Sequence, residues 1–375
     1  MKILFTLNDE FDPDAGGMGV TSGLLGAYRE RGHDVDCFSF ADLPSALPFR
    51  GKSLLFPEFV AANLRRSQAD VIDSAVGDGW LLAAAVRRRG APRPLLVARS
   101  HGLIHFADRA RREEARRGGL ELSWKYPLYW GGFRIWEATR ALRLADLCLF
   151  LNDQERDYAV ESLQLDPTRA PVVDNGLPES LLGQPFEPSD AAPGEFCVAH
   201  IGSYLELKGV RYAAEGLIAL MTRHARARVT FLGASCPPEQ VLADYPEELW
   251  PRIEVMPRYG REQLPELLRD HSVILTATLK EGFPLGTLEA MACGLAAVSA
   301  ATPGPLQYVR DGDNGIVVPQ ADGAAIGSAL ERLIADPDLL RSLQRGAHET
   351  AQRYSWRRIA DETLALYTEA LERLG

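Results

Sequence analysis

The sequence has few cysteines and no long hydrophobic run. Its five cysteines are an odd number, form no Cys-x-x-Cys pair and lie among apolar or small residues. Such a set predicts buried free thiols instead of a disulfide framework or a metal site. The longest apolar runs, such as residues 144–151, contain Asp146 and are far shorter than the roughly 20 residues that span a bilayer. We therefore expect no transmembrane helix.

Basic residues are also fewer than acidic ones. The 41 lysines and arginines stand against 51 aspartates and glutamates, a net charge of −10. This balance argues against nucleic acid as the main partner, because a surface that binds a polyanion needs clustered cations. Met1 and Lys2 lead directly into a strand-like run with no small-residue cleavage site behind it, so we expect a cytoplasmic protein without a leader peptide.

The chain is longer than one hydrophobic core usually supports. With 375 residues, 46% hydrophobic and 25% charged, it has the composition of an ordered globular protein of two domains. Its first half reads strand (2–7), glycine-bearing loop (14–19), helix and strand (35–40), a βαβ unit that implies a parallel sheet. Further strand-like runs follow at 71–74, 95–99, 147–152 and 171–174.

The periodic pattern stops between Gly176 and Gly194, where prolines crowd together, and then restarts. We expect an N-terminal domain over 1–180, a linker over 181–194, a second domain over 195–355 and a closing amphipathic helix over 356–375. The fold class is α/β, with two doubly wound Rossmann-like domains facing across a cleft. Ligands of such sheets bind beyond the carboxyl ends of the strands, so the chemistry is expected in that cleft.

The most informative stretch, from Glu281 to Gly294, reads E-G-F-P-L-G-T-L-E-A-M-A-C-G. Its two glutamates are eight positions apart, one in the loop after a predicted strand and one about a turn into the next helix. The first-turn amides between them have no helical partner and, with the helix dipole, suit a diphosphate. Because a diphosphate repels carboxylates, we expect the glutamates to accept hydrogen bonds from hydroxyls on either side of it. The alternative for an isolated pair is a plain helix start.

This stretch closely resembles the E-G-F-x-L-x-x-x-E-A-M-A-x-G signature of the retaining glycosyltransferases of family 4, which have the two-domain GT-B fold. Other landmarks resemble the family in the same order: Ala145-Asp146, Asn175-Gly176, Asp311-Gly312-x-x-Gly315 and Tyr354-Ser355-Trp356. The resemblance is strongest over 197–375 and thinner over about 40–140. It implies glycosyl transfer with retention, acceptor binding by the domain over 1–180, nucleotide-sugar binding by the domain over 195–355 and a C-terminal helix that crosses back to the first domain.

A second element, residues 202–209, resembles the family's G-R-x4-K-G loop, in which the two cations neutralise the diphosphate. Lys208 is in place, but Ser203 replaces the arginine and offers only a weaker, neutral hydrogen bond. In the first half, the pair Gly16-Gly17 resembles the family's glycine pair, and His101 matches a position where the family often carries a histidine near the donor sugar. The alternatives are a solvated lysine, a tight turn and a structural histidine.

The predicted site follows from these motifs together. The catalytic residues are expected to be Glu281, Lys208 and His101. The predicted donor contacts are Gly16, Gly17, Ser203, Lys208, Glu281, Gly282, Phe283, Leu285, Gly286, Thr287 and Glu289. The predicted acceptor contacts are His105, Arg111 and Arg112, the two arginines belonging to a basic stretch that precedes an aromatic one. Arginines and aromatics suit an anionic or lipid-linked acceptor at a membrane, or one that stacks, whereas the alternative is a solvated helix followed by packed aromatics.

No metal and no cofactor are expected. The sequence lacks paired histidine spacing, and its Asp-x-Asp matches, at residues 12–14 and 34–36, lie in a polar loop and at a strand start. The expected partners are a nucleotide-sugar donor and a sugar, lipid-linked or small-molecule acceptor, with no nucleic acid and at most peripheral contact with the inner membrane face. Two other functions stay open: a nucleotide-sugar epimerase of the same architecture, and a catalytically silent binding or scaffold homologue.

Overall fold

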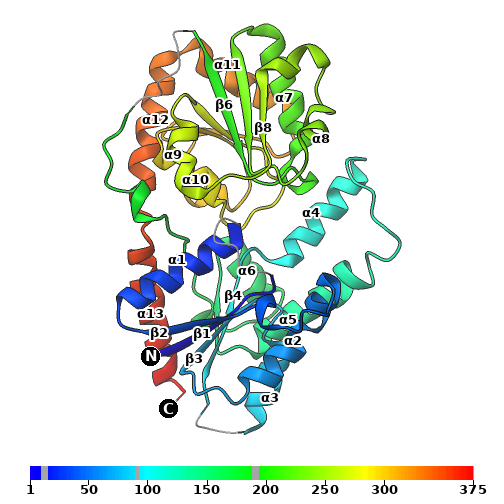
Figure 1. Cartoon of the computed structure of the whole chain (residues 1–375), viewed down its shortest axis with the longest axis vertical. Coiled ribbons are helices and arrows are strands. Elements are labelled where there is room, and N and C mark those ends of the chain that lie inside the picture. The colour runs from blue at the N-terminus through cyan, green and yellow to red at the C-terminus, as the bar shows by residue number, and fades with distance from the viewer. Residues whose placement is uncertain (10–15, 90–92, 188–193, 375) are drawn as a thin grey trace. The chain divides into compact units, whose positions relative to one another are not determined.

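The computed structural model describes residues 1–9, 16–89, 93–187 and 194–374 (Figure 1). They form two compact units. The first comprises Met1–Arg109, Leu122–Gly176 and Trp356–Gly375, and the second comprises Ala110–Glu121 and Leu177–Ser355. Each unit is built on one parallel sheet with helices, so the prediction of two Rossmann-like α/β domains is confirmed.

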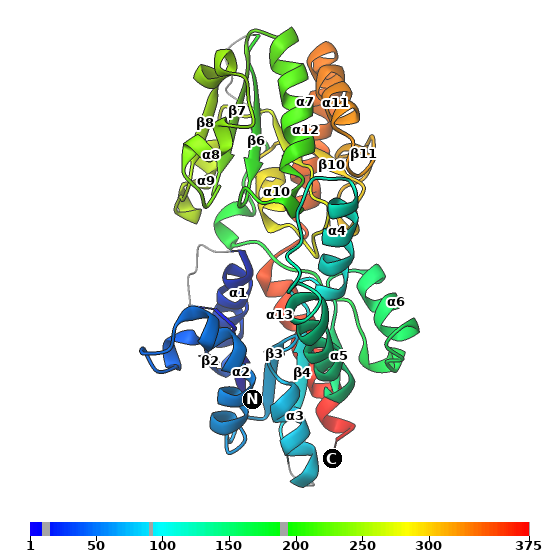
Figure 2. The same cartoon turned by 90° about the vertical axis from the view of Figure 1, so that its right-hand side faces the viewer.

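The first unit has a five-stranded sheet in the order β2-β1-β3-β4-β5, in which every neighbouring pair is parallel. Its strands are β1 (Lys2–Thr6), β2 (Asp34–Phe38), β3 (Val71–Ala75), β4 (Leu95–Arg99) and β5 (Leu147–Leu149). Its helices, seen in Figure 2, are α1 (Gly16–Glu30), α2 (Phe49–Leu64), α3 (Trp80–Val86), α5 (Arg134–Leu144) and α6 (Asp153–Glu161), and α4 (Ile104–Arg116) begins in it. The predicted strand at 171–174 is only a single bridge, between Phe150 and Val172.

The strand order of the first sheet changes direction at β1. The chain moves from β1 to β2 on one side and then to β3 on the other side of β1. In doubly wound sheets the crevice outside the carboxyl ends of the strands at such a point is the usual place for a ligand. The carboxyl ends of β1 and β3 are therefore the part of this unit to inspect for a site.

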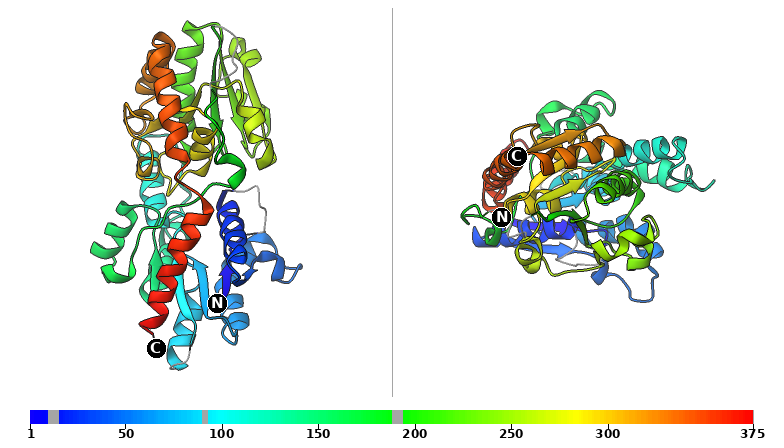
Figure 3. Two further views of the ribbon diagram at one scale, coloured as in Figure 1. Left: turned by 90° about the vertical axis from the view of Figure 1, so that its left-hand side faces the viewer. Right: turned by 90° about the horizontal axis from the view of Figure 1, so that it is seen from above.

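The C-terminal helix α13 (Trp356–Glu372) belongs to the first unit, as the resemblance implied. Figure 3 shows α13, in red, beside the blue α1, against which it packs. Tyr367 of α13 reaches a buried ion pair of the sheet, because its hydroxyl lies 3.0 Å from Arg99 Nη2 and donates to Asp73 Oδ2. Arg99 Nη2 itself lies 2.7 Å from Asp73 Oδ2. The end of the chain is thus tied to the centre of the first sheet.

The second unit has a six-stranded sheet in the order β11-β10-β9-β6-β7-β8. Its strands are β6 (Phe196–Ile201), β7 (Ala227–Leu232), β8 (Ile253–Met256), β9 (Val273–Thr276), β10 (Ala296–Ala300) and β11 (Gly315–Val318). Its helices are α7 (Val210–Arg223), α8 (Pro238–Leu242), α9 (Leu264–Leu268), α10 (Leu285–Ala292), α11 (Gly323–Ala335) and α12 (Pro337–Ala351). In this sheet too the order changes direction, between β6 and β9.

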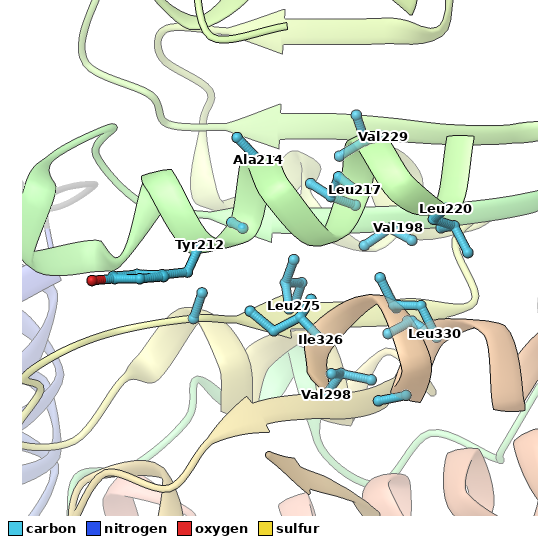
Figure 4. Close-up of a cluster of buried hydrophobic side chains, with 14 of the residues drawn as sticks. Val198, Tyr212, Ala214, Leu217, Leu220, Val229, Leu275, Val298, Ile326 and Leu330 are labelled. Atoms are coloured by element: carbon cyan, nitrogen blue, oxygen red, sulfur yellow. The ribbon is translucent and has the colours of Figure 1, made fainter. Parts of the chain in front are cut away.

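Apolar side chains of α7 and α11 fill the core over one face of this sheet (Figure 4). Leu217 and Leu330 are fully buried there together with Val198 of the central strand. The two helices pack closely, since a Cβ atom at Gly216 would lie 2.6 Å from Ile326 Cγ2.

Two predictions from composition can be compared directly with the structure. All five cysteines are free, as expected, but only Cys148 and Cys197 are fully buried. Over the described ranges, no helix is both long enough and apolar enough to cross a membrane.

Candidate functional site

The start of α10 lies at the carboxyl end of the second sheet. Pro284 is the N-cap residue of the helix and makes no side-chain capping hydrogen bond. A Cβ atom at Gly286 would lie 2.5 Å from Ile201 Cγ2 at the end of β6, so only glycine allows this close approach. The amides of the first turn therefore lie beside the end of the central strand, where an anion is expected to bind. The Thr287 hydroxyl is buried and lies 2.6 Å from Thr276 Oγ1, and its contact with the donor stays a prediction.

The two sequence elements that were predicted to hold the donor meet at this edge. Lys208 Nζ lies 2.5 Å from Glu281 Oε2, although the residues are 73 positions apart. Lys208 ends the 3-10 turn η6 (Glu206–Lys208), and Gly209 follows it with a φ of +70°. A Cβ atom at Gly209 would lie 2.0 Å from Ala277 O, so this glycine presses the loop against the end of β9. The structure brings Lys208 and Glu281 together, as their assignment to one site requires.

Glu289 is buried within α10, and its partner was not foreseen. Arg261 Nε lies 2.9 Å from Glu289 Oε1, and the Glu289 side chain is only 3% exposed. Burial raises the pKa of Glu289, whereas the Arg261 guanidinium opposes that shift and favours the carboxylate. Arg261 lies in η8 (Arg261–Gln263), soon after the carboxyl end of β8. A search for cations at strand ends, instead of at family motifs, would have found it.

Some predicted donor contacts turn out to support the loop through packing. The ring of Phe283 is buried, with its centroid 5.1 Å from that of Tyr308 and 5.9 Å from that of Tyr354. Leu285 is also buried. Next to Phe283, Gly282 is buried as well, whereas Ser203 is half-buried in the loop before Lys208. The side chains of Phe283 and Leu285 therefore face the protein interior, which leaves their backbone for a ligand.

The predicted residues of the first half are spread over different places. Gly16 and Gly17 are the first residues of α1, while Asp12 and Asp14 lie outside the described residues. His101 is exposed just after β4. Arg111 and Arg112 fall in Ala110–Glu121, which groups with the second unit by its contacts.

His105 has the environment of a structural residue. Its Nε2 lies 2.9 Å from Thr139 Oγ1, its ring packs on that of Tyr158 and its Nδ1 has no hydrogen-bond partner. Burial lowers the pKa of His105 to about 4, so the ring is neutral near pH 7. This geometry favours a role in packing over the predicted contact with an acceptor.

A polar cluster at the β1/β3 crevice was missed by the sequence analysis. Asp78, after β3, is 1% exposed and its Oδ1 accepts from Asn8 Nδ2 at 3.0 Å. Its Oδ2 lies near the buried Thr6 hydroxyl, and neither atom has another hydrogen-bond partner among the described residues. Burial raises the pKa of Asp78 to about 7. The cluster combines residues that follow two different strands, and no local motif marks it.

Comparisons with known proteins agree with this arrangement. A model described as Glycosyltransferase Family 4 matches residues 15–181, and one described as Glycosyl transferases group 1 matches residues 195–336. The D-inositol 3-phosphate glycosyltransferase of Acidothermus cellulolyticus is 29% identical over 96% of this chain and 86% of its own length. Two other proteins of that name match over only 26% and 27% of their lengths.

Solved structures show the same architecture. Sucrose-phosphate synthase from Thermosynechococcus elongatus has a TM-score of 0.79 at 21% identity, with 98% of both chains covered. Anabaena HepE in complex with UDP-glucose has a TM-score of 0.69 at 18% identity, with 97% of this chain and 99% of that chain covered. At these identities the likeness shows the fold, which is GT-B. With both family models matched and the donor motifs assembled at one sheet edge, the chain belongs to the family 4 glycosyltransferases, enzymes that use a nucleotide-sugar donor.

Proposed function

We propose that this protein is a retaining, metal-independent glycosyltransferase that holds a nucleotide diphosphate sugar at the carboxyl edge of its second sheet. The observation that carries the proposal is the meeting of Lys208, Glu281 and the uncapped start of α10 at that edge. One cation, one carboxylate and a set of free amides suit a diphosphate with hydroxyl-bearing groups beside it.

Each group has a distinct task in this proposal. The α10 amides and Lys208 bind the diphosphate and stabilise the negative charge that grows on it as the bond to the sugar breaks. Glu281 accepts hydrogen bonds from sugar hydroxyls, and Glu289 from the ribose. Lys208 and Glu281 pair directly, and in this proposal a bound donor exchanges that ion pair for its own contacts. His101 and the Gly16-Gly17 pair are proposed to contact the donor from the first unit.

The donor and acceptor are proposed only as classes. The structural relative HepE has UDP-glucose as its ligand, which makes this sugar nucleotide the first donor to test. The acceptor is a sugar, a lipid-linked compound or another small molecule with a free hydroxyl, and its predicted contacts include Arg111 and Arg112. The protein is proposed to work in the cytoplasm, with at most peripheral contact with a membrane.

Thermal shift against a panel of nucleoside diphosphates is the direct test of the donor site. A ligand that binds the folded state raises its stability by RT ln(1 + [L]/Kd). We expect one nucleoside diphosphate to raise Tm in the wild-type protein and to have a much smaller effect in Lys208→Ala. Arg223→Ala is the matched control, because Arg223 is an exposed cation of the same unit that pairs with Glu331. Equal shifts in all three proteins would contradict the site.

Measurement of donor turnover distinguishes a glycosyltransferase from an epimerase and from a catalytically silent homologue. A transferase consumes its donor faster when an acceptor is added, whereas an epimerase converts the donor alone. A silent homologue binds the nucleotide without turnover. We expect slow hydrolysis of the donor and a faster, acceptor-dependent transfer. Release of a product with inverted anomeric configuration would contradict the retaining mechanism.

A further inference from the structure

Residues 122–136 have a composition unlike the rest of the chain. The segment reads L-S-W-K-Y-P-L-Y-W-G-G-F-R-I-W and contains three of the six tryptophans of the protein. It carries two cations and neither aspartate nor glutamate, although the chain as a whole has a net charge of −10. The segment follows α4 and includes the first residues of α5 (Figure 2).

Its large apolar side chains are exposed to solvent. The exposed fractions are 77% for Trp124, 67% for Leu128, 49% for Trp136, 47% for Trp130 and 38% for Phe133. These five are nearly half of the eleven large hydrophobic side chains exposed among the described residues. Scattered single residues of this kind are normal on a protein surface, but a contiguous group marks a binding surface.

The fold keeps these side chains exposed by anchoring the backbone beneath them. The π-helical turn Tyr129–Phe133 has no buried residue. It leads into α5, where the buried Glu137 accepts from Arg134 Nη1 at 2.7 Å and from Trp80 Nε1 at 3.2 Å. The Trp80 ring in turn packs edge-on against that of Trp136, at 4.9 Å between centroids. The aromatic side chains are therefore held on an ordered support and do not collapse into the core.

The chemistry of the segment fits a bilayer surface. Tryptophan rings with neighbouring cations are typical of the zone between lipid headgroups and acyl chains. Lys125 Nζ lies 5.4 Å from the Trp124 ring centroid, so charge and ring are presented together. Arg134 is committed to Glu137, so Lys125 is the exposed cation of the segment. The exposed Lys125 beside the Trp124 ring complements anionic lipid headgroups.

We propose that residues 122–136 form a docking surface for an anionic phospholipid bilayer, with Trp124 and Leu128 entering the headgroup region and Lys125 meeting lipid phosphates. Docking of this kind is peripheral, since the segment is far too short to span a bilayer. The inference goes beyond the proposed transfer reaction and stands whether or not the donor assignments hold.

Co-sedimentation with large unilamellar vesicles tests the proposal without any substrate. The wild-type protein is expected to sediment with vesicles of phosphatidylglycerol and phosphatidylcholine and much less with phosphatidylcholine alone, with a blue shift of tryptophan fluorescence on binding. The double variant Trp124→Ser/Leu128→Ser should bind about tenfold more weakly or worse, because it removes the two most exposed apolar side chains. Lys125→Glu should weaken binding to the anionic vesicles selectively.

Two controls accompany the experiment, a variant outside the segment and the Tm of the double variant. Phe49→Ser removes an aromatic side chain that is 60% exposed in the same unit but lies outside the segment, and it should leave vesicle binding unchanged. Tm should also be unchanged in the double variant. Absence of wild-type binding, equal binding by the double variant, or an equal loss in Phe49→Ser would each overturn the proposal. So would a wild-type dimer that the double variant abolishes while neither protein binds vesicles, since the segment would then be a contact between copies. Donor binding, measured by thermal shift, reports separately on the proposed function.

Discussion

Lys208 is the residue whose removal separates ligand binding from folding most cleanly. Its ion pair with Glu281 joins side chains that are 27% and 21% exposed, so solvent screens it and its loss should change Tm little. The lost charge-assisted contact with the diphosphate is worth about 1.5–3 kcal/mol. We therefore expect Lys208→Ala to lower kcat/KM for the donor by roughly 10- to 150-fold. Steady-state kinetics check this, and unchanged kcat/KM in a folded variant would remove Lys208 from the site.

Ser203 occupies the position at which the family loop has an arginine. Its replacement by arginine should therefore strengthen donor binding, whereas Lys208→Ala should weaken it. If the loop has the family geometry, Ser203→Arg adds a second cation beside the diphosphate and tightens donor binding by up to about 1.5–3 kcal/mol. Titration calorimetry with a nucleoside diphosphate measures the change. Weaker binding would show that the loop requires a small residue, or that another cation such as Arg261 already fills the subsite.

The buried Asp78 carboxyl should make the stability of the folded protein depend on pH. Its pKa is about 7 in the folded protein, against 3.8 for an unperturbed aspartate. Between these values the folded state binds more protons than the unfolded state, so stability falls as the pH rises from about 4 to about 7. Asn at this position cannot ionise and still accepts from Asn8. Asp78→Asn should match the wild-type protein near pH 4 and be more stable near pH 8, by several kcal/mol at about 1.4 kcal/mol per pKa unit.

Chemical denaturation at a series of pH values tests this difference directly, because the other titrating groups are common to both proteins. Curves that run parallel from pH 4 to pH 8 would mean that Asp78 is not held in a protonated state. A lower stability of Asp78→Asn at every pH would mean that its carboxyl makes a contact that an amide cannot replace.

At the scale of elements, α13 is predicted to stabilise the first sheet through one hydroxyl. Tyr367→Phe leaves the buried Arg99–Asp73 pair without the Tyr367 hydroxyl and should cost about 1–3 kcal/mol. Tyr28→Phe is the matched control, because Tyr28 is equally buried and its ring packs against that of Tyr367, but its hydroxyl lies near Tyr367 and Thr363 instead of bonding to the Arg99–Asp73 pair. Urea unfolding should show a loss in the first variant and little change in the second. Equal losses would assign the effect to packing.

Helices and strands could be predicted from the sequence where the apolar pattern that marks them lies within the element itself. Apolar runs with short glycine-bearing turns identify the buried parallel strands, and the three- and four-residue spacing of apolar positions identifies α13. The run at 171–174 has the same local pattern but makes only one bridge, because pairing depends on a neighbouring strand that the local pattern does not reveal. The grouping of Ala110–Glu121 with the second unit is likewise set by distant contacts, such as that between the Tyr212 hydroxyl and Glu114.

At the scale of the whole molecule, the candidate site also combines residues that could be predicted from the sequence with residues that could not. Lys208 and Glu281 could be paired from the sequence because each belongs to a motif whose place in the fold is known from the resemblance. Arg261 and Asp78 could not, since neither lies in such a motif and each acquires its role from a partner brought near by the fold. Burial, which decides the pKa of Asp78, is also a property of the folded chain and is not encoded in its immediate neighbours.

The charge of the whole molecule leads to a final prediction, on metal dependence. A protein with a net charge of −10 must still bind an anionic donor, so the positive potential has to be local. The α10 amides supply it at the edge of the second sheet, and Lys208 adds to it once the donor has replaced Glu281 as its partner. Transfer should therefore persist in excess EDTA and change little when magnesium is added. The assay follows donor consumption after chelation, with Lys208→Ala as the protein in which the charge is lost by mutation. Complete loss of wild-type activity in EDTA, restored by magnesium or manganese, would show that a divalent cation, and not Lys208, neutralises the diphosphate.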